Sequence, residues 1–120
     1  MVIKIEIYEL LKAYSMQKKC FKPIYEKYYD ETSPCKESFA KFVSRTKKSS
    51  FQMYWIIHNS TKVGQIWIAT KNDTAILARL FVLPKYQNKG YATKAIIDIE
   101  KLYSNYKHWQ LDLSLIHISE

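Results

Sequence analysis

The 120-residue sequence has few residues that bend, loosen or cross-link a backbone: two glycines, three prolines and two cysteines. Two glycines exclude collagen-like repeats, Gly-rich linkers and the three-glycine fingerprint of dinucleotide-binding loops. Cys20 and Cys35 are too few for a disulfide framework and have no CxxC spacing. We therefore interpret both as free thiols of a reducing compartment, with one structural disulfide as the alternative.

Long apolar runs are also missing. No stretch reaches the ~18 apolar residues of a membrane-spanning helix, and residues 1–15 alternate apolar with charged side chains. That segment has neither the continuous apolar core nor the small-residue cleavage site of a signal peptide. We expect a protein that does not enter a membrane, with the cytoplasm as its default location.

Acidic residues are outnumbered, with 11 Asp and Glu against 19 Lys and Arg, which gives a net charge of +8. A basic domain can bind nucleic acid, an anionic membrane surface or a small molecule rich in phosphate. The cations are dispersed along the chain, so a merely soluble surface is an equally good interpretation. His58, His108 and His117 lack the spacing of a metal site.

The first half of the chain predicts one strand and two helices. Apolar and polar residues alternate over 2–8, which is the pattern of a half-buried strand. Apolar residues at helical spacing over 9–20 predict a helix, which Pro23 interrupts. The pair Ser33-Pro34 then has the character of an N-cap and a first helical residue, so we expect a second helix that ends near Lys48.

The second half predicts an antiparallel meander followed by a helix and a parallel strand. Aromatic and β-branched residues fill 51–57, 63–69 and 75–83, and short polar turns separate these runs. An apolar face continues at helical spacing over 92–106, and 109–118 then has strand character. This succession implies a right-handed crossover between parallel neighbours. The predicted fold class is α+β: one domain over the whole chain, with a mixed, mostly antiparallel central sheet and flanking helices.

The loop after strand 75–83 places the second glycine, Gly90, where the long helix begins. A helix N-terminus offers N–H groups and the positive end of its dipole, and both favour a phosphate. A glycine lets a bulky anion approach the backbone without meeting a Cβ atom, and Lys89 and Lys94 add positive charge. The spacing is also compatible with an ordinary helix start in which Gly90 only eases the turn.

The amino-acid sequence of this region resembles the acetyl-CoA-binding motif of the GNAT family of N-acetyltransferases. The motif consists of Gln or Arg, two residues, Gly, one residue, and then Gly or Ala. Here it is Gln87-Asn88-Lys89-Gly90-Tyr91-Ala92, preceded by Leu80-Phe81-Val82-Leu83-Pro84 and followed by an amphipathic helix. The resemblance covers residues 51–114 well and the N-terminal helices loosely, and it implies an acyl-CoA N-acyltransferase-like fold.

The resemblance implies that acetyl-CoA is the co-substrate and that its acetyl group passes to a primary amine by direct attack. Backbone N–H groups of the motif are expected to hold the pyrophosphate, and backbone groups of the preceding strand to bind the pantetheine arm. That requires strands 75–83 and 109–114 to splay apart. The expected acetyl-CoA-binding residues are Leu80, Phe81, Val82, Gln87, Asn88, Lys89, Gly90, Tyr91, Ala92 and Thr93.

Catalytic groups are harder to assign. Several members of the family have a carboxylate early in the cofactor-binding strand, but the matching stretch 75–77 contains no acid. Asp73 lies just before it, and Asp112 on the next strand is a weak candidate for the general base. In many members the general acid is a Tyr on a helix after the last strand, which this chain does not reach. The base, the acid and the amine acceptor stay unassigned.

The family's last helix and final two strands have no counterpart here, so we expect a fragment that lacks the last third of the domain. Residues 114–120 have the character of a non-native tail, since they resemble translated adapter sequence and not the family's next turn. The strand 109–118 would then present an uncovered edge, which favours a homodimer.

Three functions from different classes stay open. The first is an N-acetyltransferase acting on a primary amine. The second is an inactive domain that binds acetyl-CoA or a protein partner, which the missing acid and base favour. The third is a basic module that binds nucleic acid through lysines and aromatic side chains, which a tight strand–loop–helix phosphate site disfavours.

Overall fold

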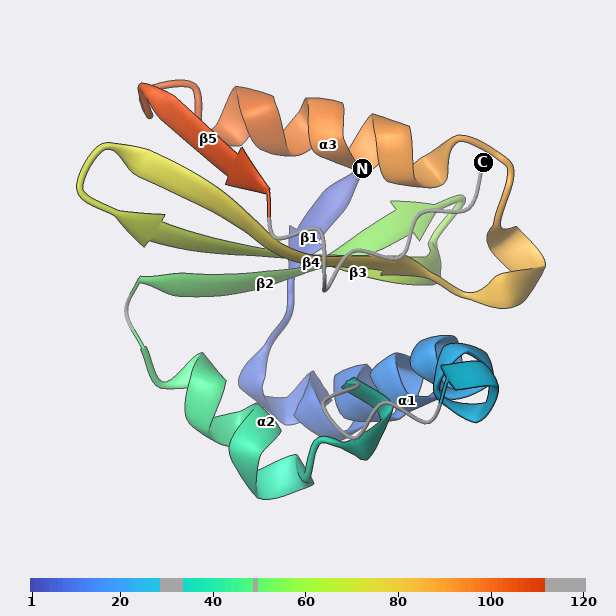
Figure 1. Cartoon of the computed structure of the whole chain (residues 1–120). Coiled ribbons are helices and arrows are strands. Elements are labelled where there is room, and N and C mark those ends of the chain that lie inside the picture. The colour runs from blue at the N-terminus through green and yellow to red at the C-terminus, as the bar shows by residue number, and fades with distance from the viewer. Residues whose placement is uncertain (29–33, 49, 112–120) are drawn as a thin grey trace.

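The computed structural model describes residues 1–28, 34–48 and 50–111, with side chains described throughout except at 24–28, Pro34 and Leu111. A five-stranded sheet lies at its centre, with the strands in chain order from β1 to β5. Helix α3 (Tyr91–Leu102) covers one face, and α1 (Leu10–Tyr28) with α2 (Phe39–Thr46) covers the other (Figure 1). The predicted α+β fold, with a mixed sheet and flanking helices, is confirmed.

Three antiparallel strands form the predicted meander: β2 (Phe51–His58), β3 (Thr61–Lys71) and β4 (Thr74–Val82). The turn between β2 and β3 places Asn59 and Ser60 in the left-handed region, at φ 50° and 65°. Two such residues in succession give a short turn the twist that matches its flanking strands. The local turn chemistry and the strand pattern therefore agree here.

Strand β5 (His108–Leu111) returns beside β4 after the crossover through α3 and pairs with it in parallel, from Thr74 to Leu77 of β4. The parallel strand predicted over 109–118 is confirmed in its described part. The rest of that stretch, including the candidate base Asp112, lies outside the described residues.

A β-bulge interrupts β4 directly after this pairing. Leu77 lies opposite Ile68 of β3 and Arg79 lies opposite Trp67, so Ala78 is an extra residue between the two pairs. A bulge bends its strand and increases the local twist. The bend thus falls where the described pairing of β4 with β5 ends.

Each face of the sheet has its own apolar core. Side chains alternate along β4, so that Leu80 and Val82 pack under α3 together with Ala95 and Ile99. Phe81 points to the opposite face and joins the core beneath α1 and α2. That second core also contains Phe21, Phe42, Trp55 and Trp67, which supply most of its volume.

The first strand is shorter than its pattern predicts. β1 spans Val2–Lys4 and pairs antiparallel with β2, and the chain then enters a 3-10 turn, η1 (Ile7–Glu9). The backbone N–H of Glu6 donates to the Glu9 carboxylate at 3.0 Å. This bond satisfies a backbone donor at the start of a helical turn, and it takes the chain out of the sheet before residue 8.

Helix α1 continues through Pro23, so the prediction that this proline interrupts the helix was wrong. A proline inside a helix removes one backbone hydrogen bond and crowds the carbonyl four residues earlier. Cys20 and Phe21, just before the proline, are buried against the sheet. Packing of this face outweighs the local cost of the proline.

Helix α2 begins later than the Ser33-Pro34 pair predicts. Pro34 opens a separate 3-10 turn, η2 (Pro34–Lys36), and Ser33 lies outside the described residues. The N-cap of α2 is Ser38, whose Oγ accepts the backbone N–H of Lys41 at 3.2 Å. Both serines are good N-cap residues, and the packing of the intervening segment decides between them.

Helix α3 ends at Leu102, before the predicted residue 106. Tyr103 is the C-cap and its N–H donates to Ile99 O at 2.9 Å, after which Tyr106 N–H turns back to Tyr103 O at 3.1 Å. Both tyrosines still pack against the core under α3. The apolar face therefore runs past the end of the helix, which explains the longer prediction.

In the described ranges no helix is long and apolar enough to cross a bilayer. No cluster of His, Cys, Asp and Glu among these residues could hold a metal ion. Cys20 and Cys35 are free thiols, as predicted, and burial raises the pKa of the Cys20 thiol to about 12.

Candidate functional site

The first half of the loop between β4 and α3 is fixed by its own hydrogen bonds. Pro84 opens a 3-10 turn, η3 (Pro84–Tyr86), in which the Tyr86 N–H donates to Leu83 O at 2.8 Å. The side chain of Gln87 then turns back, and its Nε2 donates to Val82 O at 3.0 Å. The loop is thereby tied to the last residue of the strand.

Gly90 is the N-cap of α3 and has left-handed backbone, with φ 79°. A Cβ atom built there would have no heavy atom within 4 Å, so the backbone angle requires glycine and crowding does not. The first helical hydrogen bond runs from Lys94 N–H to Gly90 O at 3.1 Å. The N–H groups of Tyr91 and Ala92 precede that bond, so they have no partner within the helix and point out of its N-terminal end.

Strand β4 also offers backbone groups at the edge that faces away from β3. The Leu83 N–H donates to Val63 O of β3 at 2.8 Å. Successive residues of an antiparallel strand direct their backbone groups to opposite edges, so Val82 and Leu80 direct theirs away from β3. Within the described residues β5 pairs with β4 only as far as Leu77, and this stretch of edge has no described strand beside it.

The edge of β4 that faces away from β3, the loop and the N-terminus of α3 follow one another along the chain. A small pocket of about 10 Å³ lies where they meet, lined by Val82, Tyr86, Gln87, Asn88, Gly90, Tyr91 and Ala92. Lys89 and Lys94 are exposed on either side of Gly90 and add to the positive end of the helix dipole. An extended molecule with amide groups can pair with such an edge while its anionic end binds at the helix.

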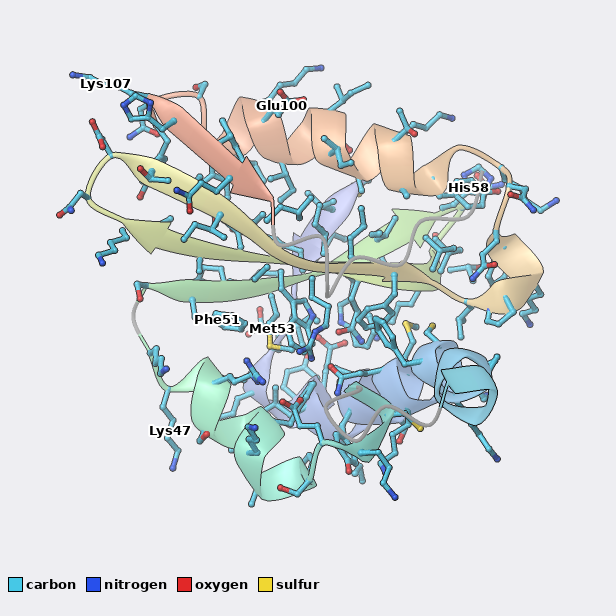
Figure 2. The ribbon with its side chains drawn as sticks, viewed as in Figure 1. Lys47, Phe51, Met53, His58, Glu100 and Lys107 are labelled. Carbon is cyan, nitrogen blue, oxygen red and sulfur yellow. The ribbon has the colours of Figure 1, made fainter. Side chains whose placement is uncertain are left out.

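The start of α3 is held from the neighbouring turn as well. The ring of Tyr91 lies against the ring of His58 at the end of β2, with centroids 4.6 Å apart and planes at 35°. Figure 2 shows His58 beside the junction of the loop and α3. The position of Gly90 is therefore set both by β4 through the loop and by β2 through this ring contact.

The predicted binding residues come together, but they do not share one role. Leu80 and Val82 direct their backbone groups away from β3, whereas Phe81 between them directs its backbone to β3 and its buried ring to the core under α1. Gln87 contributes its side chain to the loop itself. Thr93 is exposed in the first turn of α3. The sequence was sufficient to locate the segment, but it could not tell which of its residues point toward the proposed ligand and which point into the core.

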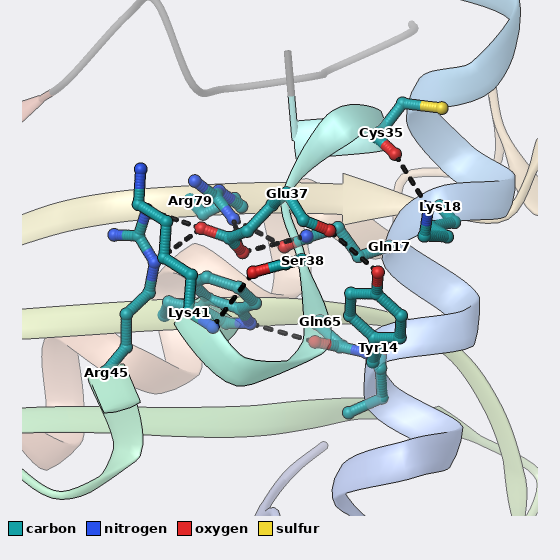
Figure 3. Close-up of polar contacts among 12 residues, drawn as sticks. Tyr14, Gln17, Lys18, Cys35, Glu37, Ser38, Lys41, Arg45, Gln65 and Arg79 are labelled. Atoms are coloured by element: carbon teal, nitrogen blue, oxygen red, sulfur yellow. Dashed lines mark hydrogen bonds and ion pairs between the residues drawn. The ribbon is translucent and has the colours of Figure 1, made fainter. Parts of the chain in front are cut away.

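A buried polar cluster on the other side of β4 was missed by sequence reasoning. Arg79 follows the bulge and is 2% exposed. Its Nη1 lies 3.5 Å from Glu37 Oε1 and donates to Gln17 Oε1, while the guanidinium lies 4.3 Å from the centre of the Trp67 ring. Arg45 of α2 donates from Nε to the second Glu37 oxygen at 2.8 Å (Figure 3).

Glu37 is the centre of this cluster. Gln17 donates from Nε2 to its carboxylate at 3.1 Å, and the Tyr14 hydroxyl donates to its backbone carbonyl at 2.7 Å. Glu37, which lies just before the N-cap of α2, thus links α1, α2 and the bulged part of β4. The signal in the sequence is the arginine inside the apolar run AILARLFV, because a buried guanidinium requires an acidic partner.

Comparison with known families gives one match. The model of the acetyltransferase (GNAT) family matches residues 7–112. That range begins at η1 and includes the bulged strand, the loop and all of α3. No curated protein sequence matches the chain.

Solved structures share the fold at low sequence identity. The PaiA N-acetyltransferase of Thermoplasma acidophilum, in complex with coenzyme A, has a TM-score of 0.69 and 20% identity, over 87% of this chain and 71% of its own. The ribosomal-protein-S18-alanine N-acetyltransferase of Escherichia coli has a TM-score of 0.65 and 16% identity, over 86% of this chain and 58% of its own. An acetyltransferase of Vibrio fischeri has a TM-score of 0.68 and 14% identity, over 93% of this chain and 94% of its own. This chain therefore spans less than two thirds of the Escherichia coli enzyme.

Proposed function

Because the chain belongs to the acetyltransferase (GNAT) family, we propose that it binds acetyl-CoA and transfers the acetyl group to a primary amine by direct attack. One observation carries the proposal: the β4 edge at Leu80 and Val82 continues into a loop that ends at a glycine-capped helix N-terminus. The strand edge is complementary to the amide groups of the pantetheine arm, and the helix N-terminus is complementary to the pyrophosphate of the same molecule.

The residues of this surface fit the groups of acetyl-CoA. A pyrophosphate needs N–H donors and positive charge, which the first turn of α3 supplies together with Lys89 and Lys94. The pantetheine arm contains amide groups, which can bond to the backbone of Leu80 and to the N–H of Val82 as an added strand would, while the Val82 carbonyl accepts the Gln87 side chain. Open space at the Cβ position of Gly90 lets a phosphate reach the backbone.

In this proposal the chain acts mainly by positioning. Acetyl-CoA supplies the acetyl group as a thioester that an amine nitrogen can attack. Holding the phosphate end at α3 and the arm along β4 restricts the motion of the donor, so that an amine bound nearby meets a fixed carbonyl. The amine must be neutral to attack, so we expect the transfer rate to rise with pH until the amine is deprotonated.

Titration calorimetry with acetyl-CoA tests the site through the variant Gly90→Asp. The aspartate introduces a Cβ atom and a negative charge at the proposed pyrophosphate position, and we expect affinity to fall about tenfold or more. Asn72→Asp is the matched control, because it adds the same charge at another left-handed turn residue, with φ 55°, between β3 and β4. Equal affinities of the two variants would contradict the proposed site.

Acetyl-CoA binding without transfer is the second candidate function. The composition of β4 favours it, because Thr74–Val82 contains no Asp, Glu or His and its one charged side chain, Arg79, is buried on the α1 side. Incubation with acetyl-CoA and a panel of amines, followed by mass spectrometry, separates the two functions. An acetylated amine supports transfer, and binding without any product supports the second candidate.

A further inference from the structure

A groove of about 840 Å³ lies on the side of the sheet opposite α3, between α1 and residues of β2, β3 and the segment directly after β4. Its walls include Tyr8, Leu11, Lys12 and Lys19 from η1 and α1, with Lys62 from β3 and Leu83 from the start of the loop after β4. Leu83 packs against the core under α1. The groove is therefore separated by the sheet from the surface at the N-terminus of α3.

The groove exposes large apolar side chains. Tyr8 is 83% exposed and Leu11 is 65% exposed, and the adjacent Ile7 is 82% exposed. A cluster of exposed large apolar side chains bordered by charges marks an interaction site on a soluble protein. An aromatic or aliphatic side chain of a partner would remove this area from water and would act as an anchor.

The rim of the groove is positively charged. Glu9 is the one carboxylate among the described residues that line it, and its Oε2 lies 2.6 Å from Lys62 Nζ. This contact lowers the pKa of Glu9 to about 2, so the two charges offset each other at neutral pH. Lys12 and Lys19 are both exposed, and no carboxylate other than Glu9 lines the groove in the part of the chain that the structure describes. Two positive charges therefore border an apolar surface.

We propose that this groove binds a segment of an acidic polypeptide that carries an aromatic or aliphatic side chain. The segment from Tyr8 to Lys19 extends over about 16 Å at helical rise, a length that about five residues of extended peptide span. The apolar side chain rests against Tyr8 and Leu11, and carboxylates farther along the peptide meet Lys12 and then Lys19.

Charge and shape favour this occupant over the alternatives. A second copy of this chain has the same +8 charge, so joining two such grooves would bring lysines together. A bilayer is flat and would cover Tyr8 and Leu11 without filling the groove beside them. The proposal concerns the α1 side alone and does not rest on acetyl-CoA binding.

Fluorescence anisotropy tests the proposal with a labelled peptide in which glutamates flank a Leu-Phe pair. We expect binding that weakens with added salt and that disappears when lysines replace the glutamates or serines replace Leu-Phe. The double variant Lys12→Glu/Lys19→Glu should weaken binding about tenfold or more, and Leu11→Ser should weaken it as well. The matched control is Lys101→Glu/Lys107→Glu, which makes the same charge change at two exposed positions away from the groove, in the last turn of α3 and directly before β5.

Equal weakening by both double variants would overturn the proposal, because overall charge and not the groove would then attract the peptide. Binding of phosphatidylserine vesicles or of a single-stranded oligonucleotide in place of the peptide would overturn it too. So would a dimer, seen by light scattering, that Leu11→Ser dissociates. Thermal melting followed by circular dichroism confirms that each variant is folded, which is expected because all the substituted side chains are exposed.

Discussion

At the scale of single residues, the two glycines serve opposite purposes. Gly64 of β3 lies opposite Val82, and a Cβ atom there would be 2.2 Å from the carbonyl oxygen of Phe81. Gly90 has free space and needs glycine for its left-handed backbone angle. The sequence pointed to Gly90 because a local motif surrounds it. The crowding at Gly64 is invisible in the sequence, because it depends on how closely β4 approaches β3.

We predict that Gly64→Ala destabilises the fold more than Gly90→Ala. The first forces a side chain against backbone atoms that cannot rotate away, at a cost of about 3 kcal/mol. The second imposes only backbone strain, of about 1–2 kcal/mol. Urea denaturation of both variants measures the difference. A larger loss for Gly90→Ala would mean that the close approach at Gly64 is wrong.

The ion pair of Glu9 with Lys62 predicts a dependence of stability on pH. The contact lowers the pKa of Glu9 from 4.5 to about 2 in the fold, so the pair stabilises the protein above pH 4.5 and loses that effect as the pH falls toward 2. Wild type should exceed Glu9→Gln by about 1 kcal/mol near neutral pH, and the difference should vanish near pH 2. Urea denaturation across this range measures it, and a difference that stays constant with pH contradicts the assignment.

At the scale of the elements, prediction succeeded where local pattern and packing agree, as in the meander and α3. It failed at Pro23 and at the start of α2 (Ser38), where packing overrides a local signal. The bulge at Ala78 leaves no mark in an apolar run, because any small apolar residue suits it. Arg79 is conspicuous in the sequence, yet its partner Glu37 could not be chosen among many acids without the fold.

The Glu37 cluster should be a main connection between the helices and the sheet. We predict that Glu37→Gln destabilises the protein by about 3 kcal/mol, because Arg79 and Arg45 lose the carboxylate that they share in a buried site. Glu100→Gln is the control, an exposed position on α3 that Figure 2 labels, with an expected change of about 0.5 kcal/mol or less. Thermal and urea unfolding report both. Similar stability of the two variants would show that the cluster does not hold these elements together.

At the scale of the whole molecule, the sheet separates two surfaces of different character. Lys89 and Lys94 lie beside the helix N-terminus on one side, and Lys12 and Lys19 border the groove on the other. A contiguous motif made the first surface predictable from the sequence. The groove could not be predicted, because it forms only where η1 and α1 meet residues of β2, β3 and the segment after β4. Four of the 19 Lys and Arg residues thus border these two surfaces, which the net charge of +8 alone does not reveal.

The most direct test of the central claim is a backbone amide spectrum recorded by NMR during titration with acetyl-CoA. We predict that one set of amide signals shifts with the same dissociation constant: those of Leu80, Val82, Gly90, Tyr91 and Ala92. The signals along the α1 groove should not shift. A spectrum in which the strand edge and the helix N-terminus do not respond, or in which only the groove responds, would contradict the claim.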